Sequence, residues 1–147
     1  MKIKGLLSIG VTDILGTGIS GIFWFFLATL ISPENFGEIF YFIGIASLVS
    51  YISLIGTQDT IIVYVAKKIK IQSTLNVISL VIGGISLIVI VTIFDRIDVG
   101  FLLLAFVINT LAIGDLLGRN LYSSYAKYFL IQKILTLVLG FGFYYLF

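Results

Sequence analysis

The chain has 147 residues, of which 60% are hydrophobic and only 11% are charged, and its formal net charge is +2. About a quarter of the residues of a typical soluble domain are charged, so this composition excludes an ordinary water-soluble fold. The small and dispersed positive charge gives no indication of nucleic-acid binding. Cysteine and histidine are both absent, which excludes disulfides, thiol nucleophiles and the usual zinc sites. Lipid is therefore the expected solvent for most of this chain.

Long apolar runs with at most one charged residue each predict transmembrane helices rather than β-strands. A bilayer core about 30 Å thick needs about 20 apolar helical residues. The apolar runs are residues 14–31, 36–55, 75–94, 99–117 and 134–147. They are continuous and, for the most part, roughly twice as long as the alternating strands of a membrane barrel, which have about 10 residues. Since only a helix satisfies its own backbone hydrogen bonds along such a run in lipid, we expect helices.

The expected fold is an all-α integral membrane protein, a single bundle of about five transmembrane helices spanning residues 1–147. The helices are predicted at about 8–31, 36–66, 75–94, 99–118 and 129–147. Asp13 interrupts the early apolar run, and the run beyond it is too long for a signal peptide, so the first helix is expected to be retained. Pro33 ends the first helix within a short turn, and residues 95–98 form a turn tight enough to require an antiparallel helix pair.

Two segments fit this plan less simply. Residues 56–66 make the second helix overlong, which predicts a tilted helix or one that protrudes into the cytoplasm. Residues 120–133 mix tyrosines with Ser, Lys and Gln, a pattern that favours a helix lying in the membrane interface. The remaining 134–147 would extend only about 21 Å as a helix. We therefore expect an incomplete transporter rather than a C-terminus left in lipid.

The basic residues predict the orientation. Eight of the nine fall on one side of the predicted spans, and only Arg96 falls on the other. The eight are Lys2, Lys4, Lys67, Lys68, Lys70, Arg119, Lys127 and Lys133. Cytoplasmic loops carry the excess of Lys and Arg, so the N-terminus is expected in the cytoplasm and the turns at 32–35 and 95–98 outside. The chain is expected to be a multi-pass protein of the cytoplasmic membrane.

Polar side chains within the spans indicate which helix faces meet protein. The third predicted helix has such a stripe, made of Asn76, Ser79, Gly83 and Ser86; the first carries Asp13, Thr17, Ser20 and Trp24, and the fourth Ala105, Asn109, Ala112 and Arg119. For the small residues, close helix packing is the preferred interpretation. An ionisable group in a membrane is costly and more informative. Asp13, Asp59 and Asp115 lie near the cytoplasmic helix ends, and Asp115 precedes Arg119 by four residues, which allows an ion pair. A structural role and a place in a polar cavity both remain open for these carboxylates.

No enzyme signature is present. The chain has no P-loop, no GxSxG or HExxH motif and no paired acid constellation. No catalytic residue, metal or cofactor is therefore expected.

Three stretches resemble the polysaccharide biosynthesis flippases of the multidrug/oligosaccharidyl-lipid/polysaccharide exporter superfamily. The most specific is Ser-Pro-Glu-Asn-Phe-Gly at 32–37, which resembles the family's connection between helices one and two; residues 54–66 and Tyr-Ala-Lys-Tyr at 125–128 are similar to later family segments. Thr29 and Val63 stand where the family has basic residues, and Ser32 stands where it has glycine. The resemblance implies two six-helix lobes that alternate access to a central polar cavity, with this chain forming most of the first lobe.

The resemblance implies a flippase that moves a lipid-linked oligosaccharide from the cytoplasmic to the outer leaflet. The candidate pathway residues are Asp13, Asp59, Asn109, Asp115 and Arg119. The expected partners are membrane lipids, the lipid-linked glycan and a second chain supplying the missing lobe, but no nucleic acid. Two alternatives stay open, a drug or metabolite exporter of the same superfamily and a membrane assembly subunit that transports nothing.

Overall fold

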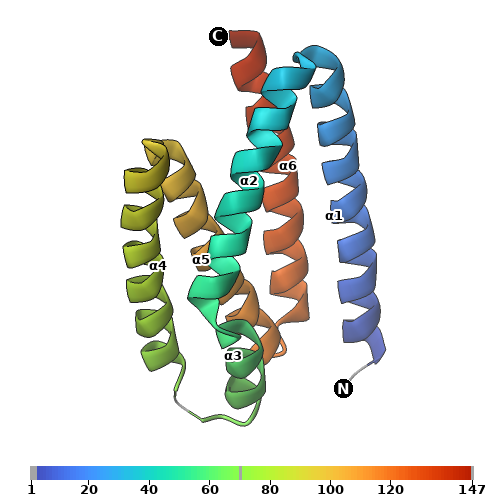
Figure 1. Ribbon diagram of the computed structural model, residues 1–147. Helices are drawn as coiled ribbons and strands as arrows, with labels where there is room; N and C mark the ends of the chain where they lie inside the picture. The colour runs from blue at the N-terminus through green and yellow to red at the C-terminus, as the bar shows by residue number, and fades with distance from the viewer. Residues whose placement is uncertain (1–2, 70, 147) are drawn as a thin grey trace. The chain divides into compact units, whose positions relative to one another are not determined.

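The computed structural model describes residues 3–69 and 71–146, and this part of the chain contains helices and no strands (Figure 1). The helices are α1 (Ile3–Leu30), α2 (Pro33–Leu54), α3 (Thr57–Ala66), α4 (Gln72–Phe94), α5 (Ile97–Gly118) and α6 (Tyr122–Leu146). The all-α prediction is confirmed. Lys2, Lys70 and Phe147, which entered the predictions of orientation and of the last helix, lie outside the described residues.

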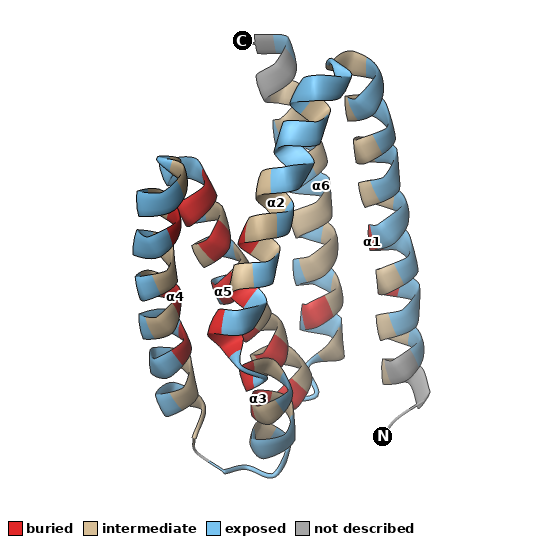
Figure 2. Ribbon diagram, viewed as in Figure 1, coloured by how far each residue is buried: buried red, intermediate tan, exposed pale blue. Residues whose placement is uncertain are grey.

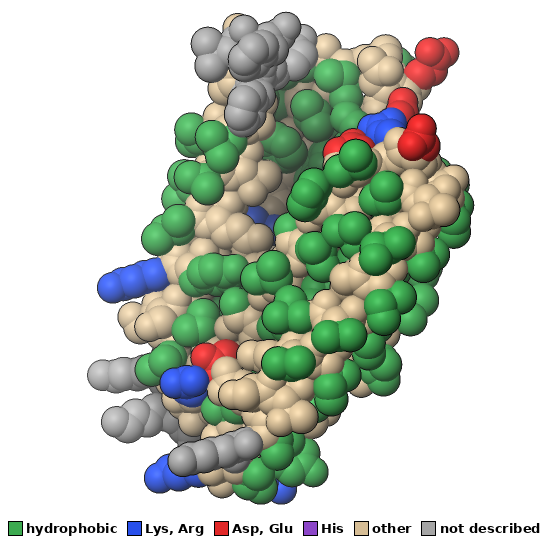
Figure 3. Space-filling model, turned by 90° about the vertical axis from the view of Figure 1, so that its left-hand side faces the viewer, with side chains coloured by type: hydrophobic (Ala, Val, Ile, Leu, Met, Phe, Trp, Pro, Cys, Tyr) green, Lys and Arg blue, Asp and Glu red, His purple; other side chains and the backbone are tan. Residues whose placement is uncertain are grey.

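Within the described residues, four helices are long and apolar enough to cross a membrane: Leu7–Leu30, Pro33–Leu54, Gln72–Phe94 and Ile97–Gly118. Their outward sides are hydrophobic. Ile14 on α1, Tyr51 on α2 and Ile88 on α4 are 74%, 79% and 65% exposed, and hydrophobic side chains cover most of the face in Figure 3, where charged ones are sparse. Water would penalise so much exposed apolar surface, whereas lipid accepts it. The chain is a membrane-embedded helical protein.

The chain divides into two compact units. The first consists of Met1–Phe36 and Leu121–Phe147, and the second of Gly37–Asn120. The first unit therefore contains α1 and α6, and the second contains most of α2 together with α3, α4 and α5.

In the first unit, α1 and α6 pack side by side and run in the same direction. Three glycines each face an aromatic ring of the other helix, in order along both: Gly5 faces Tyr122, Gly16 faces Phe129, and Gly140 faces Phe23. A glycine leaves room for a ring from the neighbouring helix, so the two backbones approach closely. Phe141 adds edge-to-face ring contacts with Phe23 and Phe26 on α1, at 5.8 and 6.1 Å between centroids.

Helix α6 differs from the prediction. The semi-polar segment 120–133 was expected to lie in the interface, separate from a short last span, whereas the structure has one helix of 25 residues. At 1.5 Å per residue it is about 37 Å long, enough to cross a bilayer core. The physical reason is that two aromatic side chains of this segment pack against α1: Tyr125 is buried, and Phe129 fills the space beside Gly16.

In the second unit, α4 and α5 form the predicted antiparallel pair. Asp95, with φ of 52°, ends α4 in the left-handed region, and α5 begins two residues later. Gly100 lies against Leu87, and Gly83 lies against Val107, so the two backbones come close along the pair. Both glycines are buried, and Figure 2 shows buried residues along the facing sides of these helices.

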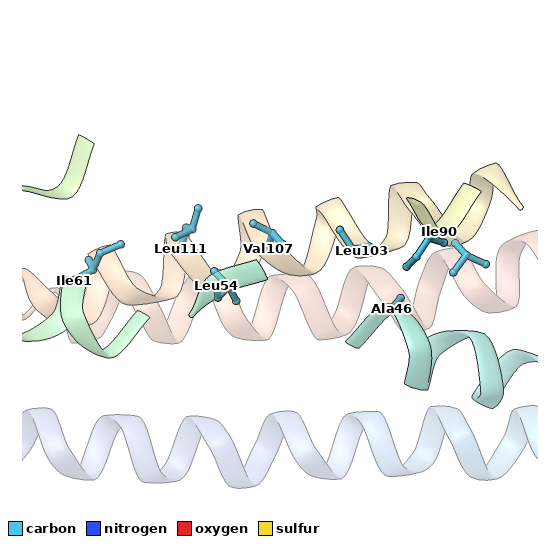
Figure 4. Packing of buried hydrophobic residues seen from close by; sticks show 8 residues of the cluster. Ala46, Leu54, Ile61, Ile90, Leu103, Val107 and Leu111 are labelled. Carbon is cyan, nitrogen blue, oxygen red and sulfur yellow. The ribbon is translucent and has the colours of Figure 1, made fainter. Parts of the chain in front are cut away.

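The apolar core of the second unit is organised around α5. Leu103, Val107 and Leu111 recur every four residues and form one buried stripe (Figure 4). Around this stripe lie Ala46 and Leu54 of α2, Ile61 of α3, Ile90 of α4 and Val99 of α5. Every helix of the unit thus contributes to a single core.

The second predicted helix, 36–66, is two helices in the structure. Ile55 and Gly56 both have positive φ, 46° and 69°, and they separate α2 from α3. Left-handed backbone is natural for glycine but unusual for a β-branched residue such as isoleucine. The change of direction lets α3 pack against α5, where Gly114 lies against Gln58 and Gly118 against Val65.

Candidate functional site

Hydroxyl groups join the helices of the second unit. The Ser53 hydroxyl on α2 lies 2.9 Å from that of Ser86 on α4, and Ser79 on α4 donates to Thr57 on α3 over 2.9 Å. Thr57 in turn donates to the carbonyl of Leu54 across the helix break. The packing interpretation of Ser79 and Ser86 is confirmed, and the hydroxyls satisfy one another where water is excluded.

A second polar cluster fastens α2 to the turn between α4 and α5. Arg96 donates to Glu38 at 2.7 Å and to Asp98 at 2.9 Å, and its guanidinium lies 4.7 Å from the ring centroid of Phe42. The hydrogen bonds that Arg96 donates to Asp98 and, to a lesser extent, to Glu38 raise the pKa of Arg96 above its ordinary value. Both carboxylates of this cluster are paired with the Arg96 guanidinium, so we assign the cluster a structural role. The sequence pattern did not reveal this cluster, because Glu38 and Arg96 are 58 residues apart.

The opposite ends of α4 and α5 carry the polar residues of the candidate site. The predicted ion pair is confirmed: Arg119 Nε donates to Asp115 Oδ1 at 2.8 Å. Arg119 also reaches α4, because its Nη2 lies 3.4 Å from Gln72 Oε1. Close packing of Gly118 and Gly114 against α3 brings the last turn of α5 to this position.

An open pocket of about 270 Å³ lies between α4 and α5 beside this ion pair, and we call it the α4–α5 pocket. It is lined by Gln72, Asn76, Leu80, Ile108, Leu111, Ala112 and Asp115. Its polar lining consists of the side-chain amides of Gln72 and Asn76 and the carboxylate of Asp115, and the other lining side chains are aliphatic. Asn76 Oδ1 is buried and has no hydrogen-bond partner in the described part of the chain. A buried acceptor without a donor is costly, so this amide is the least satisfied polar group near the pocket.

A second pocket of about 310 Å³ adjoins it at the start of α4, and we call it the basic pocket. It is lined by Val65, Lys68, Ile69, Gln72, Ser73 and Arg119. Gln72 lines both pockets, so the polar lining is continuous from Asp115 and Asn76 to Lys68.

The structure brings together two of the five residues predicted from sequence, Asp115 and Arg119. Asn109 is half-buried on α5 and is not among the lining residues of either pocket, and Asp59 is exposed in the first turn of α3. Asp13 belongs to the first unit, where it accepts a 2.6 Å hydrogen bond from the buried Tyr125. Whether any of the five contributes to a pathway stays a prediction.

Several lining residues were not among the candidates, namely Lys68, Gln72, Ser73 and Asn76. A signal for two of them exists in the sequence: Gln72 and Asn76 are four residues apart, hence on one face of a helix, at the entrance to an otherwise apolar span. Within the described residues no group of three or more acidic side chains could hold a metal ion.

Comparison with known proteins gives no significant match to any family model, curated protein or solved structure. The fold and the pockets define the class: a membrane-embedded helical protein with a partly polar pocket between two of its membrane-long helices, beside an ion pair.

Proposed function

We propose that this chain forms part of a membrane transporter of the flippase type, which moves a lipid-linked oligosaccharide from the cytoplasmic to the outer leaflet of the cytoplasmic membrane. The observation that carries the proposal is the α4–α5 pocket, in which Asn76, Gln72 and Asp115 interrupt two otherwise apolar helices. Polar and ionisable groups are costly within membrane helices, so the carboxylate and the two amides there support a polar pathway.

The position of the pocket within the helices supports transport. Its lining on α4 runs from Gln72 to Leu80, which is about 12 Å along the helix axis. It therefore reaches from the helix end well into the apolar span. A substrate from the cytoplasmic leaflet would enter at such a helix end, because the excess of basic residues predicts that this end of α4 and α5 faces the cytoplasm.

The helix break at Ile55–Gly56 supports the same proposal. Thr57 contacts Ser79, which is about 10 Å along α4 from Gln72, so the break lies at the depth of the span rather than beyond its end. Transporters commonly build their sites around interrupted helices, because unwound backbone is tolerated in a membrane only where protein or a cavity surrounds it.

The parallel packing of α1 and α6 supports five spans. Successive spans alternate in direction, so a first and a fifth span run the same way, as α1 and α6 do within the first unit. The 25 residues of α6 are sufficient for that fifth span.

The chemistry of the pocket favours a glycan over a purely apolar drug. Sugar hydroxyls can donate to Asp115 and accept from Gln72, while Leu80 and Ile108 offer a surface for the hydrocarbon carrier. The ion pair with Arg119 orients the Asp115 carboxylate, so that neither charge stands alone in lipid.

The test is surface-glycan export in cells that carry the gene, with each variant expressed at the wild-type level. Asp115→Asn and Asn76→Ala should each lower export about tenfold or more, the effect of losing a hydrogen bond of about 1.5–3 kcal/mol to a charged or buried group. Asp95→Asn is the matched control, because Asp95 is exposed at the far end of α4 and Asn accepts its left-handed backbone.

Export that is unchanged in both pocket variants would refute the proposal. Altered drug sensitivity with normal surface glycan would instead identify a drug exporter. Loss of a complex with normal export in the variants would identify an assembly subunit.

A further inference from the structure

We propose that the basic pocket binds the phosphate group of an anionic membrane lipid. The pocket lies where α3 connects to α4, against the last turn of α5. This inference needs only that the chain is embedded in a membrane, and it holds whether or not the α4–α5 pocket transports a glycan.

The charge of the lining is the first argument. Lys68 and Arg119 both line the pocket, and none of its described lining residues is a carboxylate. Asp115 engages the Nε of Arg119, which leaves donors on both η nitrogens, one of them making only a 3.4 Å contact with Gln72. The guanidinium can therefore keep its ion pair and still bind a phosphate oxygen.

Neutral donors in the lining point to the same ligand. Ser73 supplies a hydroxyl and Gln72 an amide at the start of α4. The residue before them, Ile71, has an apolar side chain, and no side chain caps the helix there. The first N–H groups of this 23-residue helix are thus left for a ligand or solvent, and the helix dipole adds positive potential to that of Lys68.

The surroundings indicate a lipid rather than a soluble anion. Val65 and Ile69 line the same pocket, and Ile69 is 43% exposed. An exposed hydrophobic side chain therefore lines the pocket together with Lys68 and Arg119. The adjoining α4–α5 pocket continues along the spans with Leu80 and Ile108. A headgroup held by Lys68 can thus place an acyl chain on an apolar surface. Basic pockets between membrane helices on the cytoplasmic side bind anionic headgroups in this way.

The experiment uses the full chain purified in a nonionic detergent, with binding measured by native mass spectrometry. The probes are short-chain phosphatidylglycerol, phosphatidylcholine of the same chain length, and inorganic phosphate. Wild-type protein should bind phosphatidylglycerol more tightly than phosphatidylcholine. Lys68→Asn should weaken phosphatidylglycerol binding about fivefold, the effect of one basic residue near an anionic headgroup.

Matched variants separate a built site from general charge. Asn accepts the left-handed backbone of Lys68, with φ of 59°, so Lys68→Asn should keep the fold. Lys67→Asn makes the same change at a neighbouring exposed lysine that does not line the pocket and should leave affinity unchanged. Lys68→Arg should retain binding.

Three results would overturn the proposal. Equal weakening by Lys67→Asn and Lys68→Asn would show diffuse attraction rather than a site. Equal affinity for the two lipids would show that the pocket does not distinguish the anionic headgroup of phosphatidylglycerol from the zwitterionic headgroup of phosphatidylcholine. Displacement of phosphatidylglycerol by inorganic phosphate at comparable concentrations would show a site for a soluble anion instead of a lipid.

Discussion

A single added methyl group on α1 tests the close packing of α1 and α6. A Cβ at Gly16 would overlap Phe129 Cε1 and lie 2.8 Å from Phe129 Cδ1. The ring has little room to move, because it stacks on the Tyr125 ring with 5.7 Å between centroids. Tyr125 is itself held by the hydrogen bond that its hydroxyl donates to Asp13. Gly16→Ala should therefore force the two helices apart or push the ring from its position.

Gly18 provides an internal control two residues away, since an added Cβ there meets nothing within 4 Å. Over-packing of a tight interface costs about 1–3 kcal/mol. Replacing a helical glycine by alanine stabilises by up to about 1 kcal/mol, and this gain applies to both sites. The propensity gain cancels in the comparison, so Gly16→Ala should be less stable than Gly18→Ala by about 1–3 kcal/mol in the free energy of unfolding.

The assay is reversible unfolding in mixed micelles with increasing SDS, followed by the loss of helical circular dichroism. A second change, Phe129→Leu, should restore part of the stability lost in Gly16→Ala, because a smaller side chain removes the overlap. Equal stability of the two alanine variants, or no coupling between positions 16 and 129, would refute the packing of α1 against α6.

Two further predictions concern other contacts and use the same unfolding measurement. Tyr125→Phe should destabilise by about 1–3 kcal/mol because it leaves the half-buried Asp13 carboxylate without its 2.6 Å donor; a variant as stable as wild type would show that this hydrogen bond contributes nothing. Gly118→Ala would place a Cβ 2.9 Å from Val65 Cβ, so it should cost about 1–3 kcal/mol relative to Gly84→Ala, whose site is open. Equal stability of these last two would contradict the close approach of α3 and α5.

Features that depend on near neighbours could be predicted from the sequence. The turn at Asp95 and Arg96, the end of α1 before Pro33 and the ion pair of Asp115 with Arg119 all follow from residues at most four positions apart. Local backbone geometry depends little on the rest of the fold, so helix caps, helix breakers and i,i+4 charge pairs are sufficient to predict these features.

The helix break at Ile55–Gly56 shows where local pattern is insufficient. A glycine within an apolar run is compatible with a continuous membrane helix, and Ile55 favours a regular backbone. The break forms because α3 gains contacts with Gly114 and Gly118 of α5, residues more than 50 positions away. These contacts cannot be predicted from the sequence of residues 36–66 alone.

The sequence by itself determined the solvent of this protein and the identity of most of its helices, because a long uncharged run has only one way to satisfy its backbone in lipid. Tertiary structure alone decided which faces meet. In lipid the outward and inward sides are equally apolar, so the pairing of Gly16 with Phe129, and the pockets where Gln72 joins Asn76 to Lys68, arise from shape and from hydrogen bonds between distant segments.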